Sequence, residues 1–302
     1  MKNIIYECGL PNTLSGGFGD RLMGIASCIS LSEKYNCKFL IKWDDFRLDN
    51  YFDFDNSNYY KHEKLEGKTI KIVNHSVKEL KEILNKKETF DCENLIFNTN
   101  QNIWQFLNEY QNVECYEDYT NNLVKTVFEK YLKPNNILET KINNITNEKK
   151  LIGIQLRFGD VLMNEENGQI NNPQRDHFPL GTNITNIRNL LINLIMNHQQ
   201  NVIFITSDIN LNKIINVKNI NNLIYLDEPP VHIERTNNKN YQNMEKCFLD
   251  FLILCKCEKL YITFESNFGR IPGIIIKDNV YAINGNLEIN NISVNELSCK
   301  RY

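Results

Sequence analysis

The sequence lacks a strong excess of either charge and lacks long apolar runs. Its 302 residues include 34 Lys and Arg against 37 Asp and Glu, a formal net charge of −3 at pH 7. So small a net charge provides no general attraction to nucleic acid or to an anionic membrane. No stretch approaches the roughly 18 apolar residues of a membrane-spanning helix, and the N-terminal residues do not form a secretion signal. We therefore expect no nucleic-acid partner, no membrane span and a cytoplasmic location.

The cysteines lack the spacing of a metal site or of a disulfide framework. There are nine, an odd number, and none forms a C-x-x-C pair. Cys255 and Cys257 are two positions apart, too close for half of a zinc site, and no cluster of histidines accompanies them. We expect the cysteines to be small buried hydrophobic residues in a reducing compartment, and we expect no metal.

The apolar residues that are present suffice for two folded domains. They make up 42% of the chain, and the length exceeds the roughly 250–300 residues that one core usually serves. Short apolar runs alternate with helical patterns, which is typical of α/β domains with parallel sheets. A polar stretch that ends near Lys150 separates them. We predict two Rossmann-like domains facing a cleft, 1–148 and 149–302.

The predicted elements follow this alternation in each domain. In the first domain, strands are expected at 3–7, 39–43, 69–73 and 95–97, and helices after Gly19 and at 77–84, 103–110 and 123–132. In the second, strands are expected at 151–156, 202–206, 223–226 and 260–264, and helices at 187–196, 244–254 and 268–276.

Four segments carry side chains suited to binding chemistry, and the first is a glycine-rich turn. Gly17-Phe18-Gly19-Asp20 follows a strand and opens a helix, where backbone amides can face an anion. No Gly-Lys-Ser/Thr follows, and Leu22 replaces the third glycine of a dinucleotide fingerprint. A plain tight turn is an equal alternative for this segment.

The second segment is Gln155-Leu156-Arg157-Phe158-Gly159-Asp160. Its first two residues end the predicted strand 151–156, and the other four follow it. Arg157 and Asp160 fall at the carboxyl edge of the predicted sheet, where open α/β sheets bind ligands. The planar guanidinium of Arg157 is suited to a diphosphate, because it donates two charge-assisted hydrogen bonds. The alternative is a structural ion pair between the two residues.

The third and fourth segments end two further strands. Thr206-Ser207-Asp208 reaches the same edge, although Ser and Asp there also serve as helix caps. Asp250 lies in an apolar helical stretch and needs partners; it can bridge the adjacent N–H and NH₂ of guanine, or pair with a Lys or Arg for structure alone. Glu265-Ser266-Asn267-Phe268 begins the last predicted helix, where Ser266 and Asn267 can cap it or hold phosphate oxygens.

Together these segments resemble the fucosyltransferase superfamily, in particular the α-1,6 branch with nodulation and core-type enzymes. Gly17-Phe18-Gly19-Asp20 with the later Ile41-Lys42-Trp43 is similar to the opening of the nodulation enzymes. The segment 155–160 is similar to the His-x-Arg-Arg-x-Asp motif. Asp250 with Phe264, Ser266 and Asn267 resembles the third motif. The resemblance touches both halves of the chain and implies a GT-B fold.

The resemblance implies an enzyme that transfers L-fucose from GDP-fucose to a glycan hydroxyl with inversion, without a metal or a second cofactor. Arg157 would hold the diphosphate and Asp250 would read guanine. The remaining expected binding residues are Gly17, Phe18, Gly19 and Asp20 of the acceptor-side domain 1–148, and Gln155, Asp160, Asp208, Ser266, Asn267 and Phe268 of the donor domain 149–302.

Two departures from the motif leave alternatives open. Gln155 replaces its His and can still bond a base or ribose, while Phe158 replaces its second Arg. For the general base we expect Asp176, and we interpret Glu165 and Glu166 as solvated loop charges. The alternatives are a transferase of another GDP-sugar, a non-catalytic sugar- or nucleotide-binding homologue and, more remotely, a dinucleotide oxidoreductase.

Overall fold

The computed structural model describes residues 1–9, 16–44, 47–54, 65–73, 76–104, 116–147, 149–158, 184–227 and 244–298. The chain forms two compact units: Met1–Ile137 with Ser298–Tyr302 is unit 1, and Leu138–Leu297 is unit 2. The boundary at 148/149 stays a prediction; the contacts divide the chain eleven residues earlier, after residue 137 rather than 148.

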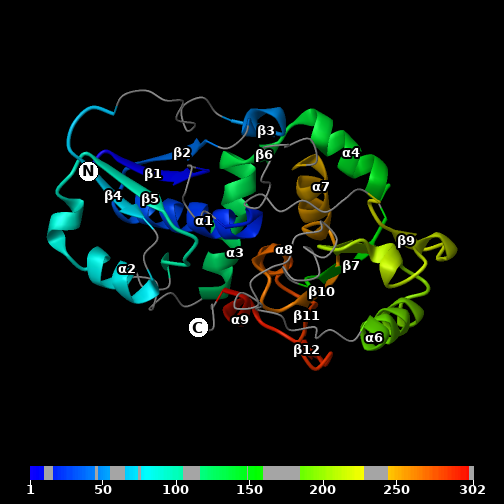
Figure 1. Ribbon diagram of the computed structural model, residues 1–302. Helices are drawn as coiled ribbons and strands as arrows, with labels where there is room; N and C mark the ends of the chain where they lie inside the picture. The colour runs from blue at the N-terminus through cyan, green and yellow to red at the C-terminus, as the bar shows by residue number, and fades with distance from the viewer. Residues whose placement is uncertain are drawn as a thin grey trace. The chain divides into compact units, whose positions relative to one another are not determined.

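Unit 1 is built on a four-stranded parallel sheet in the order β2-β1-β5-β4 (Figure 1). Its strands are β1 (Asn3–Cys8), β2 (Lys38–Trp43), β4 (Thr69–Val73) and β5 (Asn94–Asn98), and a separate two-stranded ribbon pairs β3 (Phe52–Asp53) with β6 (Lys133–Pro134). Its helices are α1 (Phe18–Lys34), α2 (Val77–Leu84) and α3 (Tyr116–Thr126), which continues as the π-helical turn η5 (Val127–Tyr131), and its 3₁₀ turns are η1 (Leu48–Asn50) and η2 (Lys87–Phe90).

Helix α1 packs closely on the sheet of unit 1. A Cβ atom at Gly24 would lie 2.1 Å from the carbonyl oxygen of Thr99 and 2.3 Å from the ring of Tyr6. Only glycine permits this approach. The helix ends where Asn36 takes a positive φ of 48°, a conformation that Asn tolerates better than most residues.

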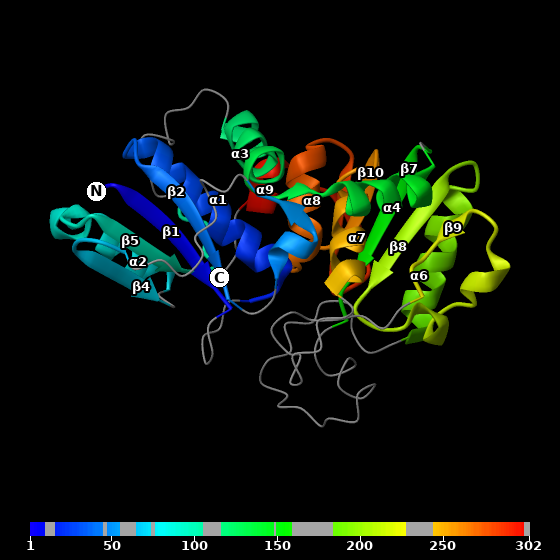
Figure 2. The ribbon, with the colours of Figure 1, turned by 90° about the horizontal axis from the view of Figure 1, so that it is seen from above.

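Unit 2 is built on a six-stranded sheet in the order β12-β11-β10-β7-β8-β9, in which only β12 runs antiparallel to its neighbour. Figure 2 labels four of these strands, β10, β7, β8 and β9. Its strands are β7 (Leu151–Leu156), β8 (Val202–Ser207), β9 (Leu223–Ile224), β10 (Lys259–Thr263), β11 (Val280–Ile283) and β12 (Ile289–Asn291). Its helices are α4 (Asn136–Thr146), α6 (Ile184–Asn197), α7 (Met244–Leu254), α8 (Asn267–Ile276) and α9 (Val294–Ser298), with 3₁₀ turns η7 (Leu211–Lys213) and η8 (Val217–Asn219).

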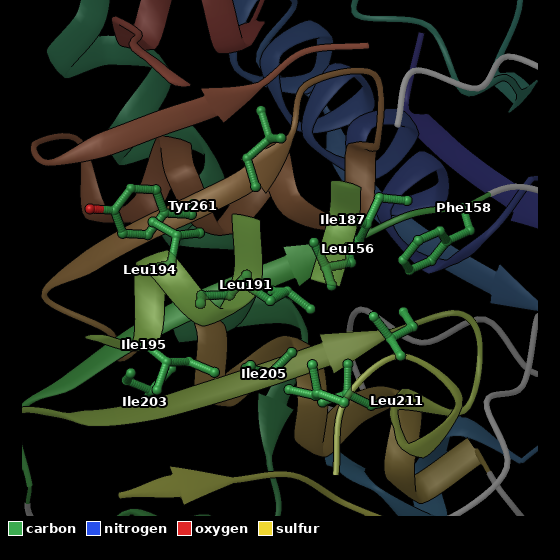
Figure 3. Close-up of a cluster of buried hydrophobic side chains, with 14 of the residues drawn as sticks. Leu156, Phe158, Ile187, Leu191, Leu194, Ile195, Ile203, Ile205, Leu211 and Tyr261 are labelled. Carbon is green, nitrogen blue, oxygen red and sulfur yellow. The ribbon is translucent and has the colours of Figure 1, made fainter. Parts of the chain in front are cut away.

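Alternate residues of β7 and β8 serve opposite faces of the unit 2 sheet. On one face, Leu156 and Ile205 join a buried cluster with Leu191 and other residues of α6 (Figure 3). The opposite face carries Gln155 and its register partner Thr206, and here α7 contacts both strands. The polar side chains at the strand ends are therefore held between the sheet and helices α7 and α8.

The predicted fold class is confirmed, because both units are α/β with largely parallel sheets. Helix α7 has the predicted bounds, 244–254, whereas β9 ends at 224 instead of 226 and β10 at 263 instead of 264. The single helix predicted at 123–132 is part of α3 followed by η5, and β11, β12 and α9 are additional elements. Most of the helix expected at 103–110 lies outside the described residues.

Candidate functional site

The candidate site lies at the carboxyl edge of the unit 2 sheet, where three neighbouring strands end. β7 lies between β10 and β8 and is parallel to both, so the ends of the three strands meet at one edge. The residues that follow them come from segments more than forty positions apart in the sequence, and hydrogen bonds connect them directly.

Arg157 and Asp208 form an ion pair across the ends of β7 and β8. The Arg157 Nη1 atom lies 3.2 Å from Asp208 Oδ2, and the arginine side chain is 24% exposed. Asp208 Oδ1 accepts a hydrogen bond of 2.7 Å from the backbone N–H of Phe158. The backbone N–H of Arg157 donates to Thr263 Oγ1 at 3.0 Å, which links it to the end of β10. The guanidinium is thus fixed at its base while part of its surface faces outward.

Gln155 connects β7 to the start of α8. Its Nε2 donates to Ser266 Oγ at 3.3 Å, so the hydroxyl of this N-cap residue is turned to the strand and makes no capping bond to its own helix. Gln155 is 3% exposed, and its Oε1 has no hydrogen-bond partner among the described residues. A buried orphan acceptor is uncommon in a folded protein, so this position suits a ligand that brings a donor.

Asp250 lies on α7 with two partners on one oxygen. Thr206 Oγ1 donates to Asp250 Oδ2 at 2.8 Å, and Lys246 Nζ lies 2.5 Å from the same atom. Both charged side chains are under a tenth exposed. One alternative from the sequence was that Asp250 pairs with a Lys or Arg, and Lys246 forms such a pair.

Asn267 and Phe268 begin α8, and each is held by a neighbour. Asn267 Oδ1 accepts from Arg270 Nη1 at 3.3 Å, and Arg270 Nε donates to the carbonyl oxygen of Leu297 at 2.8 Å. The ring of Phe268 packs edge-on against Phe251 of α7, with ring centres 5.3 Å apart. These contacts fix the first turn of α8, whose backbone N–H groups and positive dipole end suit an anion.

The side chain of Phe158, the residue after Arg157, is turned away from this site. Phe158 is 3% exposed and belongs to the core cluster on the α6 face, beyond Leu156 (Figure 3). Asp160 and Asp176 lie outside the described residues, as do Glu165 and Glu166.

The Gly17–Asp20 turn belongs to unit 1 and is described there alone. Asp20 Oδ2 accepts from the backbone N–H of Gly17 at 3.1 Å, which caps α1. Phe18 is buried against Trp43 and Phe52, with ring centres 6.5 and 6.3 Å apart. These contacts agree with the tight-turn interpretation, and a ligand role for Gly17, Phe18, Gly19 and Asp20 stays a prediction.

Several residues of the site were not singled out by sequence. Lys246, Thr263 and Arg270 each contact an expected residue. Of these, only Lys246 had a signal, because a lysine four residues before an aspartate on a helix is placed to pair with it.

The unit 1 sheet carries a second buried group of charges. Glu7 is 3% exposed and bonds the Lys42 ammonium at 2.7 Å and also the Lys71 ammonium. Burial alone would raise the pKa of Glu7, but hydrogen bonds from Lys42 and Lys71 outweigh it and lower that pKa.

Neither a membrane-spanning helix nor a metal-binding cluster occurs among the described residues. No helix in the described part of the chain has the length and apolar character that a membrane crossing requires. Within the same residues, no group of three or more His, Cys, Asp or Glu side chains is placed to hold a metal ion.

The fold is that of the GT-B fucosyltransferases of known structure. No protein-family model matches the sequence, and no curated protein matches it. The predicted resemblance is confirmed at the level of the fold.

Three solved structures illustrate the similarity. NodZ α-1,6-fucosyltransferase soaked with GDP-fucose has a TM-score of 0.61 at 11% identity, over 97% of this chain and 99% of that chain; NodZ from Bradyrhizobium has the same values. A variant of FUT1 from Arabidopsis thaliana in complex with GDP has a TM-score of 0.61 at 12% identity, over 93% of this chain and 70% of that chain.

Proposed function

We propose that this protein is a glycosyltransferase that binds GDP-fucose at the carboxyl edge of the unit 2 sheet. It transfers L-fucose to a glycan hydroxyl with inversion and needs no metal ion. The carrying observation is the convergence of Arg157, Asp250 and Ser266 at this edge. The fold supports the proposal, since the similar solved structures include complexes with GDP and GDP-fucose.

Arg157 is the residue suited to the diphosphate. Asp208 holds its guanidinium from one side at 3.2 Å, which reduces the freedom lost when the side chain binds an anion. A guanidinium stabilises the negative charge that grows on the departing diphosphate. The N-terminus of α8, with Ser266 and Asn267, provides further donors.

The transfer itself is a single displacement. The acceptor hydroxyl attacks C1 of fucose from the face opposite the nucleotide, and the bond from C1 to the β-phosphate oxygen breaks as GDP leaves. A carboxylate takes the hydroxyl proton, and we assign this role to Asp176.

Thermal unfolding with nucleotides tests the donor site. GDP or GDP-fucose at about 100 times its dissociation constant should stabilise the protein by roughly 2.7 kcal/mol. EDTA should not change the shift. Arg157→Ala should abolish it, and Arg157→Lys should retain only part of it, because lysine lacks the planar fork.

Arg188→Ala is the matched control for this experiment. Arg188 donates to the carbonyl oxygen of Ile214 at 2.6 Å and lies on α6, which covers the face of the sheet opposite to Gln155 and α7. It should lower the melting temperature without changing the shift that GDP adds. A wild-type protein that GDP and GDP-fucose leave unshifted would contradict the proposed function.

A binding protein without turnover is the second candidate, and Phe158 favours it. The motif has a second Arg at this position, whereas here a phenylalanine faces the core. Release of GDP from GDP-fucose in the presence of a glycan acceptor panel separates the two candidates, since a pure binding protein releases none.

A further inference from the structure

Lys246 is a buried lysine with no assigned role. It is 2% exposed, its ammonium lies 2.5 Å from Asp250 Oδ2, and it lies 5.6 Å from the centre of the Tyr225 ring. A lysine is almost never fully buried, because removing its charge from water is costly. An ion pair whose only role is to stabilise α7 could form at the surface, as the pair of Lys141 and Glu245 does.

The surroundings of Lys246 place donors and acceptors side by side. The ammonium has three N–H donors, and its described hydrogen bond, to Asp250, uses one of them. Thr206 donates to the same carboxylate at 2.8 Å. Gln155, the register partner of Thr206, adds the buried orphan acceptor Oε1. An ammonium, a carboxylate and an unsatisfied amide oxygen therefore lie on one face of the sheet, at its carboxyl edge.

An ammonium directly beside a carboxylate, as in Lys246 and Asp250, matches one kind of base edge. Guanine presents the acceptor O6 beside the donor N1–H, and the 2-amino donor follows. Adenine has the reverse order, an amino donor at C6 beside the acceptor N1. Bound in the same way, its amino group would face the Lys246 ammonium, and the lone pair of its N1 would face the Asp250 carboxylate.

We propose that Lys246 determines the base specificity of the nucleotide site, by donating to the 6-oxo group of a purine whose N1–H is bound by Asp250. This rests on the proposed function, namely that the edge binds a nucleoside diphosphate. It assigns Lys246 the rejection of adenine, a role separate from holding the phosphates. Inosine diphosphate keeps both O6 and N1–H, so it should bind as a guanine nucleotide does.

Calorimetric titration of the full chain with GDP, inosine diphosphate and ADP tests the proposal. Wild type should bind GDP and inosine diphosphate more tightly than ADP. Lys246→Met should lower the ratio of GDP to ADP affinity at least about tenfold, the effect of losing one hydrogen bond from a charged donor. Lys141→Met is the matched control, because it removes a lysine that pairs with α7 at 2.5 Å outside the site; it should keep the wild-type ratio.

The outcomes separate the two proposals. A folded Lys246→Met protein with the wild-type ratio overturns the role of Lys246 and leaves the proposed function standing, as does a wild type that binds GDP no better than ADP. A wild type that binds no nucleotide overturns the proposed function and this inference with it. Where Lys246→Met fails to fold, wild type is titrated with 6-thioguanosine diphosphate, whose sulfur is a weaker acceptor. Weaker binding than GDP supports the role, and equal binding overturns it.

Discussion

Single residues at the strand ends have structural partners at the positions where we propose that the nucleotide binds. Asp208 bonds both the backbone of Phe158 and the side chain of Arg157, so it positions the arginine; a ligand contact of Asp208 itself stays a prediction. A structural ion pair and a ligand site are therefore not exclusive alternatives for Arg157. Among the described residues, Arg157 forms an ion pair with Asp208, which follows the neighbouring strand; the expected pair with Asp160 lies outside them and stays a prediction.

Glu7 provides a stability prediction at the scale of one residue. Its pKa is lowered in the fold, so its ionised form stabilises the native state. That contribution is complete above the unfolded pKa near 4.5 and is lost as the pH falls through the lower, folded value. Glu7→Gln should lower the free energy of unfolding by about 1–3 kcal/mol at pH 7, and by less below pH 4.5.

Urea unfolding at pH 7 and at acidic pH measures this difference. Glu93→Gln is the control, because Glu93 also pairs with a lysine, Lys2, but is exposed. Surface pairs contribute little, so this variant should remain close to wild type. A Glu7→Gln protein as stable as wild type at pH 7 would refute the prediction.

The sequence predicted the strand-end residues but not all of their partners. Arg157 and Ser266 were predicted because polar residues that follow buried strands gather at one edge of a parallel sheet. Asp250 was predicted because a carboxylate in an apolar helical stretch needs partners.

Phe158 continues the alternation of β7, because it joins the cluster that holds Ile154 and Leu156, and its side chain is therefore turned away from the face that carries Gln155. The i,i+4 spacing indicates that Lys246 can pair with Asp250. It does not predict that Lys246 is buried, because burial of a lysine depends on tertiary partners.

At the scale of elements, the close packing of α8 on the sheet positions the site. A Cβ atom at Gly269 would lie 2.6 Å from Gln155 Oε1 and 2.9 Å from the Cβ of Ile262. Gly269→Ala should force α8 away from β10, cost about 1–3 kcal/mol by overpacking and weaken GDP binding by displacing Ser266.

Gly273→Ala is the matched variant on the same helix. Its Cβ would meet only the ends of the Leu297 and Val280 side chains, at 3.0 Å or more, and alanine favours a helix by up to about 1 kcal/mol. It should unfold within about 1 kcal/mol of wild type and bind GDP normally. Chemical unfolding and GDP titration of both variants check this, and equal behaviour of the two would contradict the packing argument.

The apolar elements α7 and β7 were predictable, whereas β12 and η5 were not. Eight of the eleven residues of α7 are apolar, and the six residues of β7 are all buried. β12 has three exposed residues, so it lacks the apolar pattern by which a strand is found. The π-helical turn η5 continues α3 from Val127 to Tyr131, and the sequence pattern predicted a single helix there.

At the scale of the whole molecule, nucleotide should protect one unit preferentially. Hydrogen exchange with and without GDP should slow in the segments that end β7, β8 and β10 and in the first turn of α8. The β4 and α2 segments of unit 1 should exchange at unchanged rates, since the proposed donor residues lie in unit 2. Uniform protection of both units would argue against a donor site confined to the unit 2 edge. The peptide that contains Gly17–Asp20 reports separately on the predicted role of that turn.

The burial of Phe158 also limits which substitutions this sequence can accept. A Phe158→Arg change would insert a charge among Ile187, Leu211 and their neighbours, at a cost of several kcal/mol unless it finds a partner. Stability of a typical domain is only about 5–15 kcal/mol, so that single step would remove a large part of it. Under the proposed function, a second cation for the diphosphate would have to come from another position of the chain.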